Sequence, residues 1–318
     1  MKAFALHRSP AQPSGSTGVL VQVDLPVPQP QSGEVVVAVR ASGVTPSELR
    51  WYPTTHNHDG SPRQDAVPGH EFSGEVVAIG QNVSHLRAGD PVFGMSDWFA
   101  NGATAQFCVA RQDSIIAKPG SLSHITAAAT PISALTAWQG LVQHARVKRK
   151  DRVLIVGASG TVGLLAVQVA RLHGCTVFGS AAASARSQLR SLGCQEVFDY
   201  HSQPFQQHLS NIDVVFDTVG GNTLACAEKI LAPKGRMVTI AADSERNKDP
   251  LVKSAYFTVE SSAALLQNIV GLIAESKLHP FVKAVLPLAE APRAYSAEVH
   301  VPALGKLVLE AECAAAAA

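Results

Sequence analysis

Residues 152–174 decide the fold of this chain, and they read Arg-Val-Leu-Ile-Val-Gly-Ala-Ser-Gly-Thr-Val-Gly-Leu-Leu-Ala-Val-Gln-Val-Ala-Arg-Leu-His-Gly. The unbroken apolar run Val153–Val156 predicts a parallel strand that is covered on both faces. Glycines in the pattern Gly-x-x-Gly-x-x-Gly permit a tight turn after that strand. Apolar residues at helical spacing from Val162 to Leu172 then predict a helix, which Gly174 ends.

This strand, turn and helix predict a nucleotide-binding site. The start of the helix presents free backbone N–H groups and the positive end of the helix dipole, which suit a pyrophosphate. A βα turn in some other α/β protein is the alternative, because a glycine pattern by itself is weak evidence. Since strand, helix and next strand all follow in order, we favour nucleotide binding. The residues expected to contact the nucleotide are Gly157, Ala158, Ser159, Gly160, Thr161, Val162 and Gly163.

Length and composition indicate a globular protein of two domains. The chain has 318 residues, which is long for one hydrophobic core, with 46% hydrophobic and 16% charged residues. Its net charge of +1 gives no general attraction to nucleic acid or anionic membranes. The absence of a signal peptide and of an apolar run of about 18 residues predicts a soluble, cytoplasmic protein. Five scattered cysteines without a Cys-x-x-Cys pair do not indicate a disulfide framework.

Residues 1–123 predict a compact antiparallel β domain, because short apolar runs alternate with Pro, Gly, Ser and Asn clusters. The expected strands are Lys2–His7, Val19–Val23, Glu34–Ala41, Gly74–Ile79, Pro91–Gly94 and Ala105–Ala110. Residues 43–66 predict a long polar loop, a place where binding groups often lie. His56 and His58 in this loop are either a metal pair or solvated residues. We favour solvated residues, since no carboxylate or thiol lies at a ligand spacing.

From His124 onwards the pattern changes to helices alternating with strands. An Ala-rich helix is expected over Ile125–Gln143, with a break at Pro131. The alternation that follows predicts a doubly wound parallel sheet with helices on both faces. Expected strands are Val153–Val156, Thr176–Ser180, Glu196–Phe198, Val214–Asp217, Met237–Ile240 and Tyr256–Val259. Expected helices are Thr161–Leu172, Ala185–Leu192, Thr223–Leu231 and Ala263–Ala274.

Short β runs broken by Pro return between Phe281 and Leu309. We therefore expect the C-terminal segment to fold onto the N-terminal domain, with the nucleotide-binding domain inserted between them. The predicted domains are 1–123 together with 262–313, and 124–261. The closing Cys-Ala-Ala-Ala-Ala-Ala from Cys313 is excluded from the fold.

Several blocks of sequence together resemble one protein family. They are, in order, Val67–Gly80, Ala88–Gly94, Leu135–Trp138, the glycine turn, Asp213–Gly221 and Gly305–Leu309. These blocks look like the medium-chain dehydrogenase/reductases, and most like their zinc-free quinone oxidoreductase branch, which is related to zeta-crystallin. The resemblance covers nearly the whole chain. It implies a Rossmann domain inserted into a GroES-like, β-rich catalytic domain, and a homodimer in which the Tyr256–Val259 strand is a candidate contact.

The resemblance also bears on zinc. Zinc alcohol dehydrogenases have a Cys after Gly-Val, a Gly-His-Glu motif and a second Cys before the nucleotide domain. Here Thr45 takes the place of the first Cys, and Thr126–Ala137 contains none. Because zinc needs three protein ligands, the resemblance implies no metal site. His70 and Glu71 are then either a relic or polar pair near the substrate, or part of a hydrogen-bonded loop, which we favour.

Cofactor choice is indicated by the end of the second strand. Enzymes that use NAD place Asp or Glu about 20 residues beyond the glycine turn, whereas Ser180 occupies that position here. Arg186 follows, where it can pair with a 2′-phosphate, and Tyr200 matches the family position near the adenosine phosphate. These residues predict NADPH. Around the nicotinamide ring the resemblance places Thr45, Thr136, Val219, Ala241 and Phe257.

The expected activity is transfer of hydride from NADPH to a quinone or to an α,β-unsaturated carbonyl compound, without zinc. Thr45 stands where the family usually has Asn, and its hydroxyl is expected to polarise the substrate carbonyl. Tyr52 is either a proton donor or an aromatic residue that anchors the loop. Two alternatives stay open. One is an alcohol dehydrogenase, and the other is a non-catalytic NADPH-binding redox sensor or structural protein.

Overall fold

The computed structural model describes residues 1–7, 18–241, 249–296 and 299–312. These residues form two compact units. The first comprises Met1–Ile132, Ser261–Val270 and Phe281–Ala318, and the second comprises Ser133–Glu260 and Gly271–Pro280. The first boundary between the two units, after Ile132, therefore lies inside the predicted helix Ile125–Gln143 and not before it. The polar stretch after Asp243 and the tail from Cys313 lie outside the described residues.

The second unit is built on a parallel sheet of five strands in the order β10-β9-β8-β11-β12. These strands are β8 (Arg152–Val156), β9 (Thr176–Ala181), β10 (Cys194–Asp199), β11 (Ile212–Asp217) and β12 (Leu231–Thr239). The chain builds outward from β8 in one direction and then returns to build from β11 in the other. The predicted doubly wound parallel sheet is confirmed, with its topological switch point between β8 and β11.

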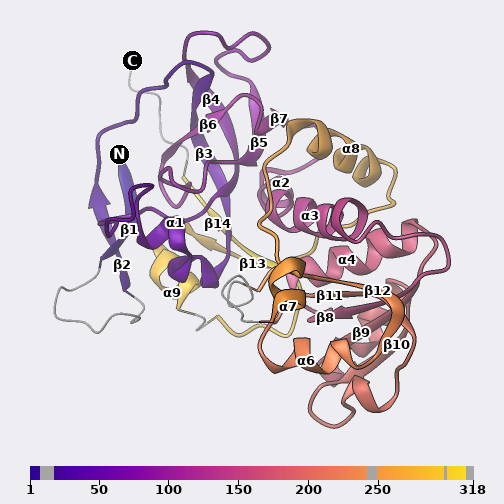
Figure 1. The fold of residues 1–318 in the computed structure, drawn as a ribbon. Helices are drawn as coiled ribbons and strands as arrows, with labels where there is room; N and C mark the ends of the chain where they lie inside the picture. Colours follow the sequence, from indigo (N-terminus) through magenta and orange to yellow (C-terminus); the bar gives the residue numbers. More distant parts are fainter. Residues whose placement is uncertain (8–17, 242–248, 297–298, 313–318) are drawn as a thin grey trace. The chain divides into compact units, whose positions relative to one another are not determined.

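Helices cover both faces of this sheet (Figure 1). They are α4 (Thr161–Leu172), α5 (Arg186–Ser191), α6 (Asn222–Glu228) and α7 (Pro250–Ala255), with the short 3-10 helices η3 (Ala183–Ala185) and η4 (Phe205–Gln207). Leu154 and Val156 of β8 pack in one buried cluster with residues of α6 and α7, and α4 lies on the opposite face. Alternate residues of β8 therefore face opposite layers, as a doubly covered strand requires.

Several expected elements differ from the structure. The helix over Ile125–Gln143 is divided into α2 (His124–Ala128), α3 (Pro131–Trp138) and a π-helix, η2 (Gln139–His144). Pro131 begins α3, because a first-turn residue needs no N–H donor. The expected strand Tyr256–Val259 is wrong: Tyr256 follows α7 and makes only an isolated bridge to Thr239. The expected helix Thr223–Leu231 ends at Glu228, and Leu231 already begins β12.

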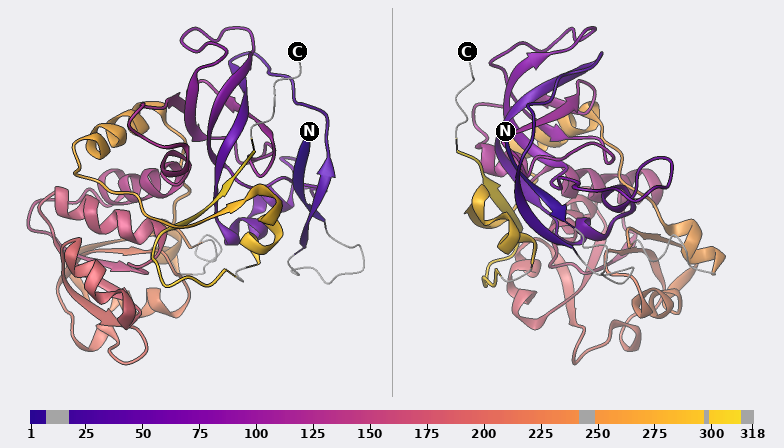
Figure 2. Two further views of the ribbon diagram at one scale, coloured as in Figure 1. Left: turned by 180° about the vertical axis from the view of Figure 1, so that it is seen from behind. Right: turned by 90° about the vertical axis from the view of Figure 1, so that its left-hand side faces the viewer.

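The first unit contains a sheet with the order β13-β14-β3-β4-β5-β7, in which β6 also pairs with β3, and a separate hairpin of β1 and β2. The strands are β1 (Lys2–His7), β2 (Val19–Asp24), β3 (Glu34–Val44), β4 (Glu71–Ile79), β5 (Pro91–Met95), β6 (Phe107–Arg111), β7 (Ile115–Ala117), β13 (Val282–Pro287) and β14 (Lys306–Glu310). The C-terminal β14 pairs antiparallel with β3, and Figure 2 shows the yellow strands beside the purple ones. The strand β7 was not expected from the sequence.

Short helices complete the first unit. They are η1 (Pro46–Arg50), α1 (Tyr52–Thr55), η6 (Leu288–Glu290), α9 (Ala291–Tyr295), the helix α2 given above and the first part of α8 (Ala263–Ala274). The whole of α8 has the predicted bounds. The expected polar loop 43–66 therefore contains two helical turns. Pro46 and Pro53 lie at the first turns of η1 and α1, where proline fits without loss of a hydrogen bond.

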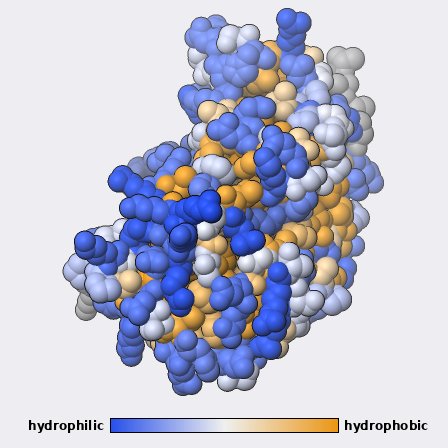
Figure 3. All heavy atoms as spheres, turned by 90° about the vertical axis from the view of Figure 1, so that its right-hand side faces the viewer, coloured by the Kyte–Doolittle hydropathy of each residue, from blue (hydrophilic) through white to orange (hydrophobic). Residues whose placement is uncertain are grey.

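The surface mixes hydrophilic and apolar side chains on the face that Figure 3 shows. Exposed large hydrophobic residues come from separate elements, among them Val19, Val219 and Leu251. Scattered apolar residues of this kind are normal on a globular protein. No helix in the described ranges is long and apolar enough to cross a membrane.

Thiol chemistry gives a first testable prediction. Burial raises the pKa of the Cys194 thiol to about 12 and that of Cys175 to about 11, and it raises that of Cys108 as well. The thiolate is the nucleophile, so these buried thiols react slowly. With iodoacetamide at pH 8 we expect the partly buried Cys226 to be alkylated in the native protein, and Cys108, Cys175 and Cys194 only after unfolding.

Peptide mass spectrometry, with and without guanidinium chloride, measures this labelling site by site. Equal native labelling of Cys194 and Cys226 would contradict the buried position of Cys194 in β10.

Candidate functional site

The glycine turn lies at the carboxyl end of β8. Gly157 has a φ of +77°, a backbone conformation that L side chains rarely adopt. The N–H groups of Gly157 and Ala158 donate to the Ser180 carbonyl oxygen at 3.1 and 3.0 Å. The predicted cofactor residue Ser180, which is buried in β9, thus fixes the end of its strand against the turn.

The turn Gly157–Gly163 forms a cradle that is packed too closely for a Cβ atom at Gly157 or Gly163. A Cβ atom at Gly157 would lie 2.8 Å from Val219 Cγ2, and one at Gly163 would lie 2.7 Å from Ala158 Cα. Gly160 precedes α4 without capping it by a side chain, so the first-turn N–H groups stay available to an anion. This arrangement fits the pyrophosphate of a dinucleotide cofactor.

Asp217 at the end of β11 organises the neighbouring turn. Its carboxylate accepts hydrogen bonds from the N–H groups of Val219 and Gly220 at 3.2 and 2.9 Å. It also accepts one from Thr239 Oγ1 at 2.8 Å, and Ala241 N–H donates to that hydroxyl at 3.1 Å. Burial raises the pKa of Asp217, and these hydrogen bonds oppose the shift. One network therefore positions Val219 and Ala241, both predicted cofactor residues.

Sequence reasoning missed Asp217 and Thr239 as site residues. Both end strands of the parallel sheet, and polar residues at the carboxyl ends of such strands are the signal that could have found them. The predicted Phe257 joins the same region, because its N–H donates to the Thr239 carbonyl at 3.1 Å. Its ring stacks on His144 with centroids 4.4 Å apart. Thr136, also predicted, lies buried in α3.

Arg186 and Tyr200 come from adjoining segments at the ends of β9 and β10. Arg186 begins α5, and its Nη2 donates to Gln203 Oε1 at 2.9 Å. Gln203 N–H donates in turn to the Asp199 carbonyl at 2.7 Å. Tyr200 lies within this turn and is 56% exposed. A guanidinium group and an aromatic ring are thereby available at the same edge of the sheet.

Thr45, in the first unit, directly follows β3. Its hydroxyl accepts a hydrogen bond from Lys306 Nζ at 3.0 Å. Lys306 is only 2% exposed and forms an ion pair with Glu71, which is fully buried at the start of β4. Sequence reasoning did not single out Lys306 for the site, although it lies within the Gly305–Leu309 block.

Glu71 has a further partner besides Lys306. Its Oε2 accepts a hydrogen bond from Ile132 N–H at 3.0 Å. Burial raises the pKa of Glu71, while Lys306 and this N–H lower it. Glu71 and its neighbour His70 therefore have different hydrogen-bond partners, although Glu48, the partner of His70, also raises the pKa of Glu71.

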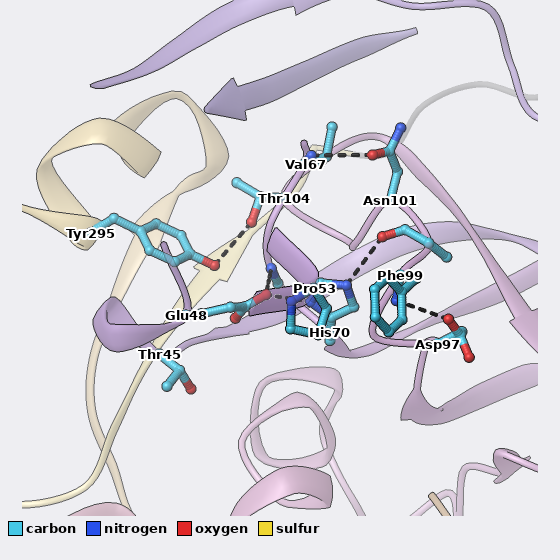
Figure 4. A network of polar contacts seen from close by, with 12 residues as sticks. Thr45, Glu48, Pro53, Val67, His70, Asp97, Phe99, Asn101, Thr104 and Tyr295 are labelled. Atoms are coloured by element: carbon cyan, nitrogen blue, oxygen red, sulfur yellow. Dashed lines mark hydrogen bonds and ion pairs between the residues drawn. The ribbon is translucent and has the colours of Figure 1, made fainter. Parts of the chain in front are cut away.

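His70 forms a buried pair with Glu48, a residue that the sequence did not reveal (Figure 4). Its Nε2 lies 3.2 Å from the Ala100 carbonyl oxygen, and its Nδ1 contacts the Glu48 carboxyl group. Gly69 N–H also donates to Glu48 at 2.7 Å. The structure thus places His70 in a hydrogen-bonded loop before β4.

Tyr295 lies near this pair, and its hydroxyl is 3.2 Å from Thr104 Oγ1. Burial, followed by the nearby Glu48, raises the pKa of the Tyr295 phenol well above its ordinary value. Figure 4 shows the Thr45 side chain directed away from the dashed contacts of this network. The Thr45 hydroxyl and the His70–Glu48 pair are therefore distinct features of the first unit.

Tyr52 begins α1 and is 45% exposed. Its ring stacks on His56, with centroids 4.5 Å apart, while His58 stacks on Phe99 at 3.7 Å. The two histidines thus have different partners. No group of three or more His, Cys, Asp or Glu residues is arranged to hold a metal ion within the described part of the chain.

Two family models match this chain, one on each side of the glycine turn. Residues 31–151 match the alcohol dehydrogenase GroES-like domain, and residues 192–309 match the zinc-binding dehydrogenase family. The chain belongs to the medium-chain dehydrogenase/reductase superfamily. The predicted membership and the GroES-like character of the first unit are confirmed.

Relatives place this medium-chain dehydrogenase/reductase in the quinone oxidoreductase-like branch. It is 28% identical over 313 residues to a chloroplastic quinone-oxidoreductase homolog of Spinacia oleracea, covering 93% of this chain and 95% of that one. It is 29% identical to the quinone oxidoreductase of Mus musculus over 310 residues, covering 91% and 92%. The structure of the Coxiella burnetii quinone oxidoreductase matches with a TM-score of 0.85 and 28% identity, covering 98% and 99%. The chain is an oxidoreductase of a superfamily that binds a nicotinamide cofactor.

Proposed function

We propose that this medium-chain dehydrogenase/reductase uses NADPH to reduce a quinone or an α,β-unsaturated carbonyl compound, and does so without zinc. The observation that carries the proposal is the hydroxyl of Thr45, held by Lys306 at 3.0 Å where the zinc enzymes have a thiolate. A hydroxyl donates a hydrogen bond to a carbonyl oxygen but does not replace a zinc ligand. The similarity to quinone oxidoreductases supports a quinone-like acceptor.

When bound, the nicotinamide cofactor supplies the hydride. The protein binds the cofactor, orients the substrate and stabilises the charge that develops on the substrate oxygen. The cradle of Gly157–Gly163 binds the pyrophosphate, and the Asp217 network holds Val219 and Ala241 in place. Thr45 donates to the substrate oxygen, which becomes more negative as the conjugated system accepts hydride. A conjugated acceptor spreads that charge, so one or two hydrogen bonds suffice.

Preference for NADPH is proposed to come from Arg186. We expect Arg186→Ala to weaken NADPH binding by at least about 1 kcal/mol and to change NADH binding little, because only NADPH carries the 2′-phosphate. Titration calorimetry with both cofactors measures this. Arg190→Ala is the matched control, since Arg190 is exposed on the same helix, α5. Equal losses for NADPH and NADH would show that Arg186 acts through the fold.

A panel of acceptors tests the reaction itself. We expect oxidation of NADPH with small quinones or conjugated enones, and little oxidation of simple alcohols with NADP. Elemental analysis and activity in a chelator test the zinc-free part, because one zinc per chain with activity lost on removal would favour an alcohol dehydrogenase. Tight NADPH binding without turnover of any acceptor would favour the non-catalytic sensor.

A cytoplasmic location and a homodimer are further proposals, which rest on the sequence and the family resemblance. The segment Tyr256–Val259 is not a strand, so it does not offer a strand edge for the contact. Light scattering of the purified chain measures the oligomeric state, and a monomer at micromolar concentration contradicts the homodimer.

A further inference from the structure

The geometry points to Lys306 as a positioning residue, whose ammonium group holds the Thr45 hydroxyl so that its proton is free for the substrate oxygen. This inference rests on the proposed reduction of a carbonyl compound. It gives a role to the buried ion pair between Lys306 and Glu71, which is not needed to fill the interior. Ion pairs in a protein interior cost desolvation, and apolar residues of similar size are often as stable.

Three neighbouring strands bring the residues together. In the first unit β14 pairs with β3, and β3 pairs with β4. The register sets Leu307 opposite Val44 and Phe72 opposite Ser42. One residue further along each antiparallel pair, Lys306 lies opposite Thr45, and Glu71 lies opposite Gly43. The middle strand therefore separates the lysine from its carboxylate.

Gly43 lets the two charges meet across that middle strand. A Cβ atom at Gly43 would lie 2.6 Å from Glu71 Oε1 and 2.7 Å from Glu71 Cγ. The carboxylate thus crosses β3 over a position that has no side chain. Any other residue at position 43 would occupy the path from Glu71 to Lys306.

The hydrogen bonds at Thr45 fix the direction of its proton. An ammonium group only donates, so the Thr45 oxygen accepts from Lys306. Within the described ranges the Thr45 hydroxyl proton has no acceptor, and the backbone is fixed because Glu48 N–H donates to the Thr45 carbonyl at 2.9 Å. The Thr45 side chain is half-buried, so its hydroxyl proton can be donated to a bound ligand. A positively charged donor on the oxygen also makes its O–H a stronger hydrogen-bond donor.

Glu71 supplies the countercharge that the buried lysine needs. An isolated ammonium group in a dry interior is costly and tends to lose its proton. The Glu71 carboxylate, itself held by Ile132 N–H, forms an ion pair with the buried Lys306. The three residues therefore act in series: Glu71 pairs with Lys306, Lys306 holds Thr45, and Thr45 contacts the substrate.

A double-mutant cycle tests this order. The variants are Thr45→Val, the paired change Lys306→Met with Glu71→Gln, which leaves no charge unpaired, and all three changes together. We expect Thr45→Val and the paired change each to lower kcat for the quinone or enone by about tenfold or more. The triple variant should have a kcat less than about twofold below that of Thr45→Val, because the hydroxyl that Lys306 orients is already absent from Thr45→Val.

Control measurements separate positioning from folding. The dissociation constant for NADPH and the unfolding midpoint are measured for every variant. Lys283→Met on β13 is the matched control for loss of a lysine, and it should leave kcat unchanged. Should the Met variant not fold, Lys306→Leu with Glu71→Gln takes its place in the same cycle, because leucine is uncharged and has no hydrogen-bond donor.

The outcomes distinguish this inference from the proposed function. Losses that multiply in the triple variant overturn the role of Lys306 and leave the proposed function standing. Retention of full kcat by the paired variant overturns it as well. A wild-type chain that reduces no quinone or enone overturns the proposed function, and the inference falls with it.

Discussion

Gly163→Ala is expected to weaken binding of a nicotinamide cofactor by about tenfold to a hundredfold and to destabilise the fold by about 1–3 kcal/mol. The added Cβ atom would lie 2.7 Å from Ala158 Cα and 2.8 Å from the Ala158 carbonyl carbon. Both neighbours are backbone atoms, so no side-chain rotation relieves the contact. The helix α4 has to move away from the turn, and its first-turn N–H groups move away from the pyrophosphate with it.

Gly271→Ala is the matched control for this substitution. Gly271 also lies within a helix, α8, but a Cβ atom there meets nothing within 4 Å. Alanine favours a helix over glycine by about 1 kcal/mol, so this variant should be at least as stable as the wild type. Fluorescence titration with NADPH and urea denaturation measure both quantities. Equal behaviour of the two variants would mean that α4 does not contact the turn as closely as described.

Glu48→Ala is expected to lower the free energy of unfolding by about 3–5 kcal/mol, the range for breaking a buried pair from one side. The side chains of Glu48 and His70 are each 1% exposed. Without the carboxylate, His70 Nδ1 and Gly69 N–H both lose their partner in the interior. A loss of this size removes a large part of ordinary domain stability.

Glu290→Ala is the control for loss of a glutamate. Glu290 pairs with Arg293 in an exposed i,i+3 pair, with side chains 40% and 54% exposed. Surface pairs of this kind contribute about 0–1 kcal/mol. Chemical denaturation should therefore show that Glu48→Ala lowers the free energy of unfolding by several kcal/mol more than Glu290→Ala does. A small effect for Glu48→Ala would mean that solvent reaches the pair.

The sequence predicts best what contiguous residues determine. Strand β8, the glycine turn and α4 follow from local patterns, because apolar periodicity and glycine conformation act within a few residues. The helix over Ala263–Ala274 follows for the same reason and has the expected bounds. The segment Tyr256–Val259 shows where local patterns fail. Its aromatic and β-branched residues favour a strand, but in the folded chain only Tyr256 forms a bridge, to Thr239.

The candidate site is less predictable because its polar contacts join distant residues. Lys306 and Thr45 lie 261 residues apart, and only the register of β14 on β3 brings them together. His70 and Glu48 meet across 22 residues through the fold of η1 and the loop before β4. No local pattern encodes such pairs. The resemblance identified Thr45 as a site residue, whereas its partner could be found only in the structure.

The crossing of Glu71 over Gly43 has a consequence for how related sequences diverge. Loss of Lys306 alone leaves the buried Glu71 carboxylate without its ion-pair partner, and loss of Glu71 alone does the same to the Lys306 ammonium group. A side chain at position 43 would keep the two groups apart. Each single step passes through a destabilised intermediate. Positions 43, 71 and 306 should therefore vary together, or not at all, across descendants of one ancestor. Lineages that have replaced the pair are expected to carry an uncharged residue at both positions and to tolerate a larger side chain at position 43.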